Sequence, residues 1–264
     1  MNLGIKGKKA LITGGATGIG QAIATDLAKE GVSVAITSRS EKSIKKTLKL
    51  LNEYGSNHYG IVSNITDDDG PEKIGKEIKD NFGNIDIVVN NAGHTLDVTD
   101  PHCDIDDWRK VFRLNLEITI EINNIFLPYM KSQDWGRIVN ITSGAGLENS
   151  GPVTFSASKA ALTAYSRSMG RVLAIETGNV VMTAVSPGIV ITEEGHWQQV
   201  LKERPKHAEK YIEERSPLGR FGEISEISPM VVLLCSEKAS FCQGAIVPVD
   251  AGQSKHYMYF NYLD

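Results

Sequence analysis

The sequence has 264 residues, of which 41% are hydrophobic, and its formal net charge is −4 at pH 7. A chain of this size can bury a substantial core, and its charge balance gives no electrostatic reason to expect a nucleic acid or an anionic membrane as partner. The three cysteines lack C-x-x-C spacing, so we expect no metal site. No run of about 18 apolar residues occurs, so we expect no membrane span. No signal-peptide pattern opens the chain, and we therefore expect a cytoplasmic protein.

The chain opens with a predicted strand, a glycine-rich turn and a helix. An apolar run at 9–13 is followed by Gly14, Gly18 and Gly20, and apolar residues then recur at helical spacing over 21–30. Such a turn lets the backbone approach a pyrophosphate and points the free amides of the helix N-terminus at it. Glycine turns before helices also arise for purely structural reasons, so this motif gains its meaning from the rest of the chain.

The second predicted strand, 32–38, ends at Ser38 and Arg39. A dinucleotide-binding fold usually has an acidic residue at this point to hold the adenosine ribose. A guanidinium can instead hold a 2′-phosphate through charge-assisted hydrogen bonds, so the sequence favours NADP(H) over NAD(H). The alternative is that Arg39 is a solvated residue at a strand end.

Helix, strand, helix and strand are predicted next, at 41–53, 58–62, 67–82 and 85–90. The motif Asn90-Asn91-Ala92-Gly93 ends the last of these strands, and His94 follows it as either a substrate contact or a solvated loop residue. A helical pattern over about 105–130 carries an apolar stripe wide enough for the sheet and for a partner helix. We therefore expect a subunit interface there.

A buried-strand pattern at 134–142 leads into Ser143, and a long helix begins near Thr154 and contains Phe155 and Lys159. The segment joins the carboxyl end of a strand to a helix, which is where open parallel sheets keep their binding sites. A strand at 180–186 then ends in Pro187 and Gly188. The remaining predicted elements are a helix at 223–236 and a strand at 244–250.

Two segments near the end of the chain are expected to have special roles. The stretch 193–217 is long and charged, and we expect it to be a lid over a substrate, because long insertions in compact domains often are. The tail 255–264 carries aromatic residues that would be costly to leave in water, so we expect it to dock on a neighbouring subunit. The alternation of strands and helices predicts one doubly wound α/β domain over 1–264, with a mostly parallel sheet.

Together these motifs resemble the short-chain dehydrogenase/reductase family over residues 8–252, and most nearly its β-ketoacyl-carrier-protein reductases. In that family a Ser is followed, on the next helix, by Tyr-x-x-x-Lys. Ser143 and Lys159 match this pattern, and Phe155 stands in the place of the Tyr. The resemblance implies an NADP(H)-dependent reduction of a carbonyl to an alcohol, with a 3-oxoacyl thioester or similar ketone as substrate. The apolar stripe between Val111 and Phe126, the helix after Phe155 and the aromatic tail separately predict a homotetramer.

The resemblance also implies a role for each matched residue. Ser143 would hold the substrate oxygen, Lys159 the nicotinamide ribose, and Asn115 a water linked to Lys159. The residues that would bind the cofactor are Gly14, Thr17, Gly18, Ile19, Gly20, Ser38, Arg39, Asn64, Asn91, Ala92, Gly93, Lys159, Pro187, Gly188, Ile189 and Thr192.

Phe155 has no hydroxyl and cannot move a proton, and loss of a positioned general acid typically lowers turnover by about 10²- to 10⁴-fold. Three explanations remain open: an engineered Tyr→Phe change, a natural cofactor-binding protein that has lost catalysis, or another donor such as a water held by Ser143 and Lys159. We favour a reductase scaffold whose Tyr has been replaced, because the other site residues survive. The rival class is a non-catalytic NADP(H)-binding or assembly protein. Tyr165 cannot substitute without a different architecture.

Overall fold

A parallel β-sheet lies at the centre of the computed structural model, which describes residues 1–55, 57–148, 150–193 and 195–254. Its seven strands are β1 (Lys9–Thr13), β2 (Ser33–Ser38), β3 (Tyr59–Val62), β4 (Ile87–Asn90), β5 (Gly136–Ile141), β6 (Val180–Pro187) and β9 (Ile246–Val249). They are arranged in the order β3-β2-β1-β4-β5-β6-β9, and every neighbouring pair is parallel. The predicted doubly wound α/β fold is confirmed.

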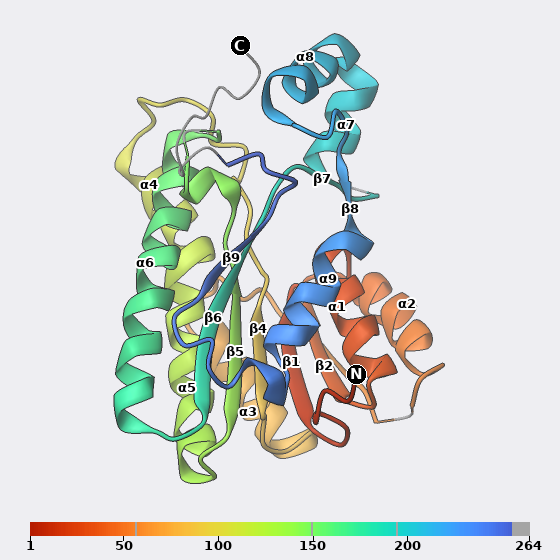
Figure 1. The fold of residues 1–264 in the computed structure, drawn as a ribbon, viewed down its shortest axis with the longest axis vertical. Helices are drawn as coiled ribbons and strands as arrows, with labels where there is room; N and C mark the ends of the chain where they lie inside the picture. The colour runs from red at the N-terminus through yellow and green to blue at the C-terminus, as the bar shows by residue number, and fades with distance from the viewer. Residues whose placement is uncertain (56, 149, 194, 255–264) are drawn as a thin grey trace.

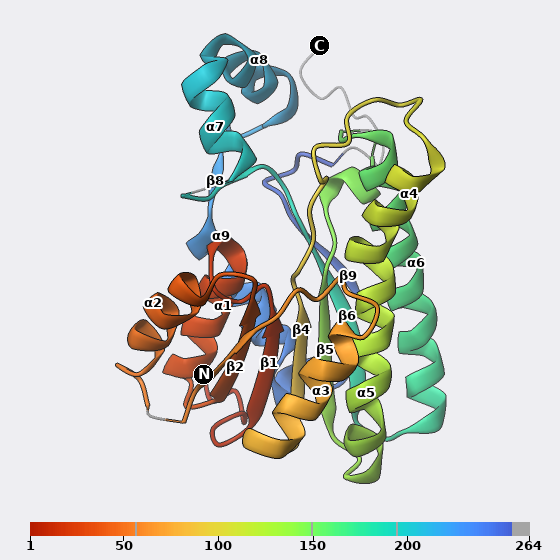
Figure 2. The same cartoon turned by 180° about the vertical axis from the view of Figure 1, so that it is seen from behind.

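Helices cover both faces of this sheet (Figures 1 and 2). One face carries α1 (Gly18–Lys29), α2 (Glu41–Leu51) and α9 (Ile224–Leu234). The other carries α3 (Gly70–Asn81), α4 (Ile105–Phe112), α5 (Ile118–Ser132) and α6 (Val153–Glu176). Short 3₁₀ turns occur at Gly144–Gly146 and Glu237–Ala239. No helix in the described ranges is long and apolar enough to cross a membrane.

The strands are apolar on both sides because each face of the sheet is covered. In β1, Leu11 packs in the same buried cluster as Ile74 of α3, whereas the next residue, Ile12, packs with Ile23 of α1. Successive side chains of a strand point to opposite faces, so a strand covered twice must be apolar at consecutive positions. This explains the near-continuous apolar runs of the sequence.

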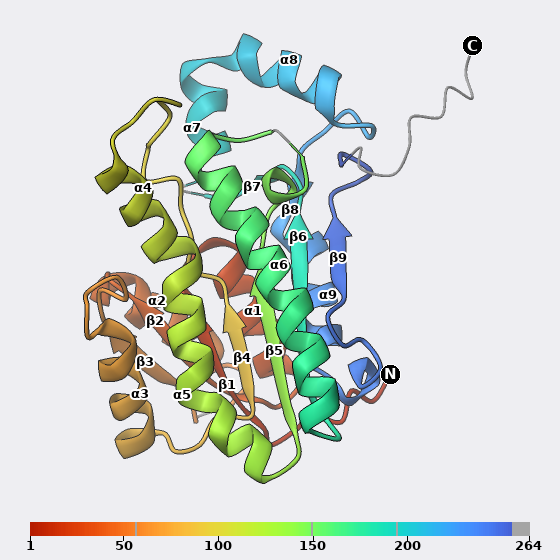
Figure 3. The ribbon, with the colours of Figure 1, turned by 90° about the vertical axis from the view of Figure 1, so that its left-hand side faces the viewer.

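Two helices stand beyond the carboxyl ends of the strands (Figures 1 and 3). They are α7 (His196–Glu203) and α8 (Pro205–Arg215), and they fall within the segment predicted to be a lid. A short parallel pair, β7 (Val190–Ile191) and β8 (Gly222–Glu223), joins this segment to the rest of the fold. The tail predicted to dock on another subunit, 255–264, lies outside the described residues.

The helix predicted over about 105–130 is divided by a π-helical turn at Arg113–Glu117, between α4 and α5. Within the turn, the Asn115 side chain donates a hydrogen bond to the Val111 carbonyl at 2.9 Å. A side chain that takes up the carbonyl four residues back competes with the regular helical ladder, and single π-turns often occur at functional sites.

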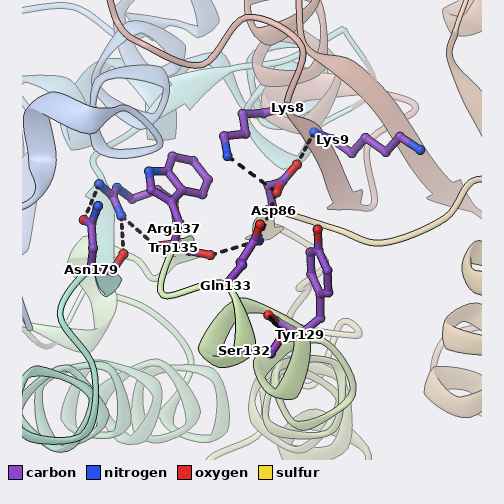
Figure 4. A network of polar contacts seen from close by, with 10 residues as sticks. Lys8, Lys9, Asp86, Tyr129, Ser132, Gln133, Trp135, Arg137 and Asn179 are labelled. Atoms are coloured by element: carbon purple, nitrogen blue, oxygen red, sulfur yellow. Dashed lines mark hydrogen bonds and ion pairs between the residues drawn. The ribbon is translucent and has the colours of Figure 1, made fainter.

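At the amino-terminal edge of the sheet, buried polar groups hold the strands together (Figure 4). The carboxylate of Asp86 accepts hydrogen bonds from the Lys9 backbone N–H at 2.8 Å and from Gln133 Nε2 at 3.0 Å, and it pairs with Lys8 Nζ at 3.8 Å. The Lys8 ammonium also lies 4.0 Å from the centroid of the Trp135 ring. This edge is opposite the one at which the strands present their carboxyl ends.

Candidate active site

A cleft of about 1080 Å³ lies at the carboxyl ends of the strands, where the strand order reverses between β1 and β4. Open α/β sheets bind their ligands at this switch point. The cleft brings together most of the residues predicted from sequence: Gly14, Thr17, Ile19, Ser38, Arg39, Asn64, Asn91, Ala92, Gly93, Ser143, Phe155, Lys159, Pro187, Gly188 and Thr192.

The glycine-rich turn has a backbone that requires glycine at several positions. Gly14 and Gly18 have φ values of +62° and +55°, which side chains rarely adopt. At Gly20 a side chain is excluded, because a Cβ there would lie 2.4 Å from the Gly14 carbonyl oxygen. Gly18 and Gly20 do not line the cleft themselves, so their part is to shape the turn. Helix α1 begins without a capping side-chain bond from Thr17 and without an acidic residue in its first turn. Its amino-terminal N–H groups therefore suit an anionic ligand.

Asn91 locks the two central strands together at the switch point. Its Nδ2 donates to the carbonyl oxygens of Thr13 and Gly14, each at 3.1 Å, and its backbone N–H donates to Thr13 Oγ1 at 3.0 Å. These bonds fix the end of β1 against the end of β4.

At the other end of the cleft, Arg39 is exposed and lines the wall next to Ser38. Asn64 lines the same wall, but its carboxamide is occupied within its own loop. Its Nδ2 donates to Asp67 Oδ1 at 2.5 Å and its Oδ1 accepts from Thr66 Oγ1 at 2.9 Å. Contact between Asn64 and the cofactor therefore stays a prediction.

The residues expected to perform chemistry meet at the inner end of the cleft. Lys159 is buried, and its Nζ donates to the Ile141 carbonyl at 2.9 Å and lies 5.7 Å from the centroid of the Phe155 ring. Burial disfavours the ammonium and lowers the pKa of Lys159 to about 8. Ser143 Oγ accepts the Ala145 N–H at 3.2 Å, which leaves its O–H available to a ligand.

Asn115 lies behind this group rather than in the cleft. Its Oδ1 accepts the His94 N–H at 3.2 Å, and its Nδ2 donates to the His94 carbonyl at 2.8 Å. A Cβ at Gly93 would lie 2.8 Å from both Asn115 Oδ1 and Lys159 Nζ, so Asn115 and Lys159 approach each other across Gly93. The predicted water relay through Asn115 stays a prediction.

Ile189 is not brought to the cleft. Its N–H donates to Gln253 Oε1 at 2.9 Å, its carbonyl accepts the Gly222 N–H at 2.9 Å, and it lines a separate cavity of about 260 Å³. Both backbone polar groups of Ile189, which was expected to bind the cofactor, thus have protein partners. Gly188 and Thr192 of the same turn do line the cleft.

The sequence reasoning missed the contribution of α4 and the turn that follows it. Arg109, Lys110, Arg113 and Glu117 also line the cleft. Arg113 is anchored by donating from Nε to the Thr66 carbonyl at 3.4 Å. A helix that directly follows the Asn-Asn-Ala-Gly landmark must start near the same sheet edge, and this was the signal available in the sequence.

Two further expectations can be compared with the described part of the chain. Tyr165 does not line the cleft, and its hydroxyl accepts a hydrogen bond from Asn123 Nδ2 at 3.2 Å. Among these residues, no group of three or more His, Cys, Asp or Glu side chains is placed to hold a metal ion.

Comparison with known proteins gives similarities that span nearly the whole chain. A sequence profile of the family described as short chain dehydrogenase matches residues 8–200. The 3-oxoacyl-[acyl-carrier-protein] reductase FabG of Aquifex aeolicus is 38% identical over 96% of this chain and 99% of its own. The crystal structure of L-sorbose reductase from Gluconobacter frateurii, complexed with NADPH and L-sorbose, matches with a TM-score of 0.87 and 26% identity, covering 97% of this chain and 99% of its own. The Pseudomonas aeruginosa RhlG/NADP active-site complex matches with a TM-score of 0.86 and 25% identity, covering 96% and 99%.

Proposed function

Since this chain belongs to the short-chain dehydrogenase family, we propose that it is an NADP(H)-dependent oxidoreductase that reduces a carbonyl to an alcohol. The observation that carries the proposal is the single cleft shared by the glycine-rich turn, Ser143 and Lys159. Relatives named as reductases of a 3-oxoacyl-carrier-protein and of L-sorbose support a ketone as substrate, and the NADPH and NADP complexes among the solved structures support the cofactor.

The described residues fit such a cofactor. The uncapped start of α1 suits the pyrophosphate, and Arg39 suits a 2′-phosphate through paired hydrogen bonds. The Lys159 ammonium has three donors, and the Ile141 carbonyl uses one of them, which leaves the others for ribose hydroxyls. When bound, the nicotinamide would supply a hydride.

The protein side of the reaction then depends on Ser143 and on position 155. The Ser143 O–H donates to the carbonyl oxygen and so stabilises the negative charge that grows there. In the family pattern a Tyr hydroxyl would protonate that oxygen, and Phe155 has no group that can do so. We therefore propose that turnover in this chain is lowered by about 10²- to 10⁴-fold relative to a Tyr-containing counterpart.

The second candidate function is a non-catalytic NADP(H)-binding or assembly protein on the same scaffold. Phe155 is the observation that favours it, because a residue without a proton-donating group lines the cleft together with the residues expected to bind the cofactor.

Replacing Phe155 by Tyr separates the two functions. Phe155→Tyr adds one oxygen atom, so it should leave stability and NADPH affinity nearly unchanged and raise turnover by about 10²-fold or more. The measurement is NADPH oxidation with acetoacetyl-CoA and L-sorbose as ketones. Phe241→Tyr, which adds the same atom to a fully exposed ring, is the control.

Ordinary turnover of about 1 to 10³ per second by the unmodified chain would contradict the assignment of a missing acid. If both forms bind NADPH and neither oxidises it with any ketone of a wider panel, the cofactor-binding function replaces the reductase.

Arg39 tests the cofactor. Arg39→Asp should reverse the preference from NADPH to NADH, because a carboxylate repels the 2′-phosphate and accepts hydrogen bonds from the ribose hydroxyls. Fluorescence titration measures the affinities for NADPH and NADH. The control is Lys79→Asp, which makes the same charge change at an exposed position of α3. Equal affinity of the unmodified chain for the two cofactors would defeat the NADP(H) assignment.

We also propose that the segment 193–217 is the substrate lid of a single catalytic domain. Its helices stand beyond the carboxyl ends of the strands (Figure 3), and Arg215 at the end of α8 lies 3.9 Å from Glu148 of the segment that carries Ser143. A homotetramer and a cytoplasmic location belong to the same proposal. The free thiols of Cys103, Cys235 and Cys242 support a reducing compartment.

A further inference from the structure

We propose that His94 donates a hydrogen bond from Nε2 to the substrate oxygen and so takes over part of the role of the missing Tyr hydroxyl. This inference rests on the proposed reductase function. It assigns a catalytic contact to a residue that sequence reasoning left open between a substrate contact and a solvated side chain.

The position of His94 is held on both sides of its backbone. A single carboxamide, that of Asn115, accepts the His94 N–H at 3.2 Å and donates to the His94 carbonyl at 2.8 Å. The preceding residue, Gly93, is in close contact with Lys159 Nζ, because a Cβ there would lie 2.8 Å from that nitrogen. The residue next to His94 in the chain is therefore close to the catalytic lysine in space. His94 itself lines the same cleft as Ser143 and Phe155.

The orientation of the ring is held as well. The Leu96 N–H donates to His94 Nδ1 at 2.8 Å. Leu96 and Asp97 have φ values of 54° and 58°, in the left-handed region that non-glycine residues seldom adopt, and such backbone clusters at functional sites. The contact between the Leu96 N–H and the ring spans two residues of the loop and ends at the first of these two positions.

This contact decides which nitrogen carries the proton. Because Nδ1 accepts a hydrogen bond, the neutral ring has its proton on Nε2. The outer nitrogen is thus a donor, and a neutral imidazole N–H can polarise a carbonyl and stabilise the oxyanion formed from it. Lys159, which lines the same cleft, is buried beside Phe155 and donates to the Ile141 carbonyl.

The reaction balances without a phenol. The nicotinamide of bound NADPH would supply the hydride to the carbonyl carbon and would itself be oxidised. The π electron pair would move to the substrate oxygen, and Ser143 O–H and His94 Nε2–H would hold the resulting alkoxide. Water from the cleft protonates the alkoxide and leaves as hydroxide. His94 keeps its own proton throughout, so the hydrogen bond that it accepts from the Leu96 N–H is preserved.

The test is His94→Asn, because the Asn side chain keeps an acceptor for the Leu96 N–H and lacks the outer donor. With acetoacetyl-CoA and NADPH, the residual kcat of the unmodified chain should fall by about 10- to 10²-fold, the scale expected for one oxyanion donor. In the Phe155→Tyr background the loss should be at least about fivefold smaller, because the phenol then supplies the hydrogen bond and the two residues are coupled. His102→Asn, at an exposed loop position, is the matched control.

A second readout does not depend on turnover. In protein labelled with ¹⁵N-histidine, the Nε2–H signal that disappears in His94→Asn should shift when 3-hydroxybutyryl-CoA is added to the complex with NADP⁺. An unchanged signal, or an equal fall of kcat in both backgrounds, would overturn the assignment.

The outcomes separate this inference from the proposed function. If Phe155→Tyr reduces the ketone and His94→Asn leaves the residual rate of the unmodified chain unchanged, the reductase stands and the role of His94 is wrong. If no form with Phe155 or Tyr oxidises NADPH with any ketone, the proposed function fails and the inference fails with it.

Discussion

At the scale of single residues, the site is defined by an amine that is buried next to an apolar ring. Lys159 is held by the Ile141 carbonyl at 2.9 Å, and the face of the Phe155 ring lies 5.7 Å from its Nζ. Removal from water disfavours the charged form and lowers the pKa of Lys159 to about 8 from an ordinary value of 10.5. At neutral pH Lys159 is therefore still charged, and keeping this buried charge lowers the stability of the folded chain. Hydrogen bonds from the ammonium to the ribose hydroxyls of a bound cofactor, as proposed, would offset that loss.

We expect Lys159 to make the free energy of unfolding rise with pH between about 8 and 10.5. Since the folded pKa lies below the unfolded one, the unfolded chain binds more protons in this window, and raising the pH favours the folded state. The gain is roughly 3 kcal/mol at most. Urea unfolding of the unmodified chain and of Lys159→Met, compared across this pH range, measures the gain. A stability difference between them that does not change with pH would contradict the prediction.

At the scale of elements, β5 serves both ends of the sheet. Its carboxyl end leads through Ile141 to Ser143, whereas near its amino end Arg137 is fully buried (Figure 4). The Arg137 guanidinium donates to the Ser236 and Asn179 carbonyls, each at 2.8 Å, and to Asn179 Oδ1 at 2.9 Å. It thereby joins β5 to the start of β6 and to the end of α9, and burial lowers the pKa of Arg137.

Arg137→Met should lower the free energy of unfolding by about 3 to 5 kcal/mol, because it leaves buried carbonyls without their donors. NADPH affinity should change little, since the network lies at the sheet edge opposite the cleft. Denaturant unfolding and cofactor titration measure the two effects, and Arg171→Met, at an exposed position of α6, is the control. Equal stability of the two variants would show that the network contributes nothing.

At the scale of the whole molecule, the apolar stripe expected to form a subunit interface is largely used inside the chain. Val111, Ile118, Ile122 and Phe126 are buried within the described subunit. The apolar side chains left at the surface of the neighbouring helix α6 include Ile175, which is 76% exposed. Burial of such side chains against another copy would be favourable.

We predict a homotetramer, so light scattering at micromolar concentration should give about four times the chain mass of 28.8 kDa. Ile175→Asp should shift the population toward smaller species if α6 forms part of the contact. Tyr54→Asp, at an exposed site after α2, should not. Light scattering that gives the mass of a monomer for the unmodified chain would rule the tetramer out.

The sequence alone determined the order of elements, the parallel sheet and the location of the cleft. Each of these depends on a local pattern: consecutive apolar residues in strands, helical spacing in helices, and glycines where the chain must turn close to a helix start. Because parallel strands present their carboxyl ends at one edge, the strand pattern is enough to place residues as distant as Gly14, Ser143 and Thr192 in one site.

Only the tertiary structure decided how individual polar groups are shared within that site. Asn115 is bonded to His94, and the Ile189 N–H is bonded to Gln253, a residue 64 positions away. A hydrogen bond extends only about 3 Å, so its partner depends on how loops pack after the strands have assembled, and no spacing pattern in the chain encodes that.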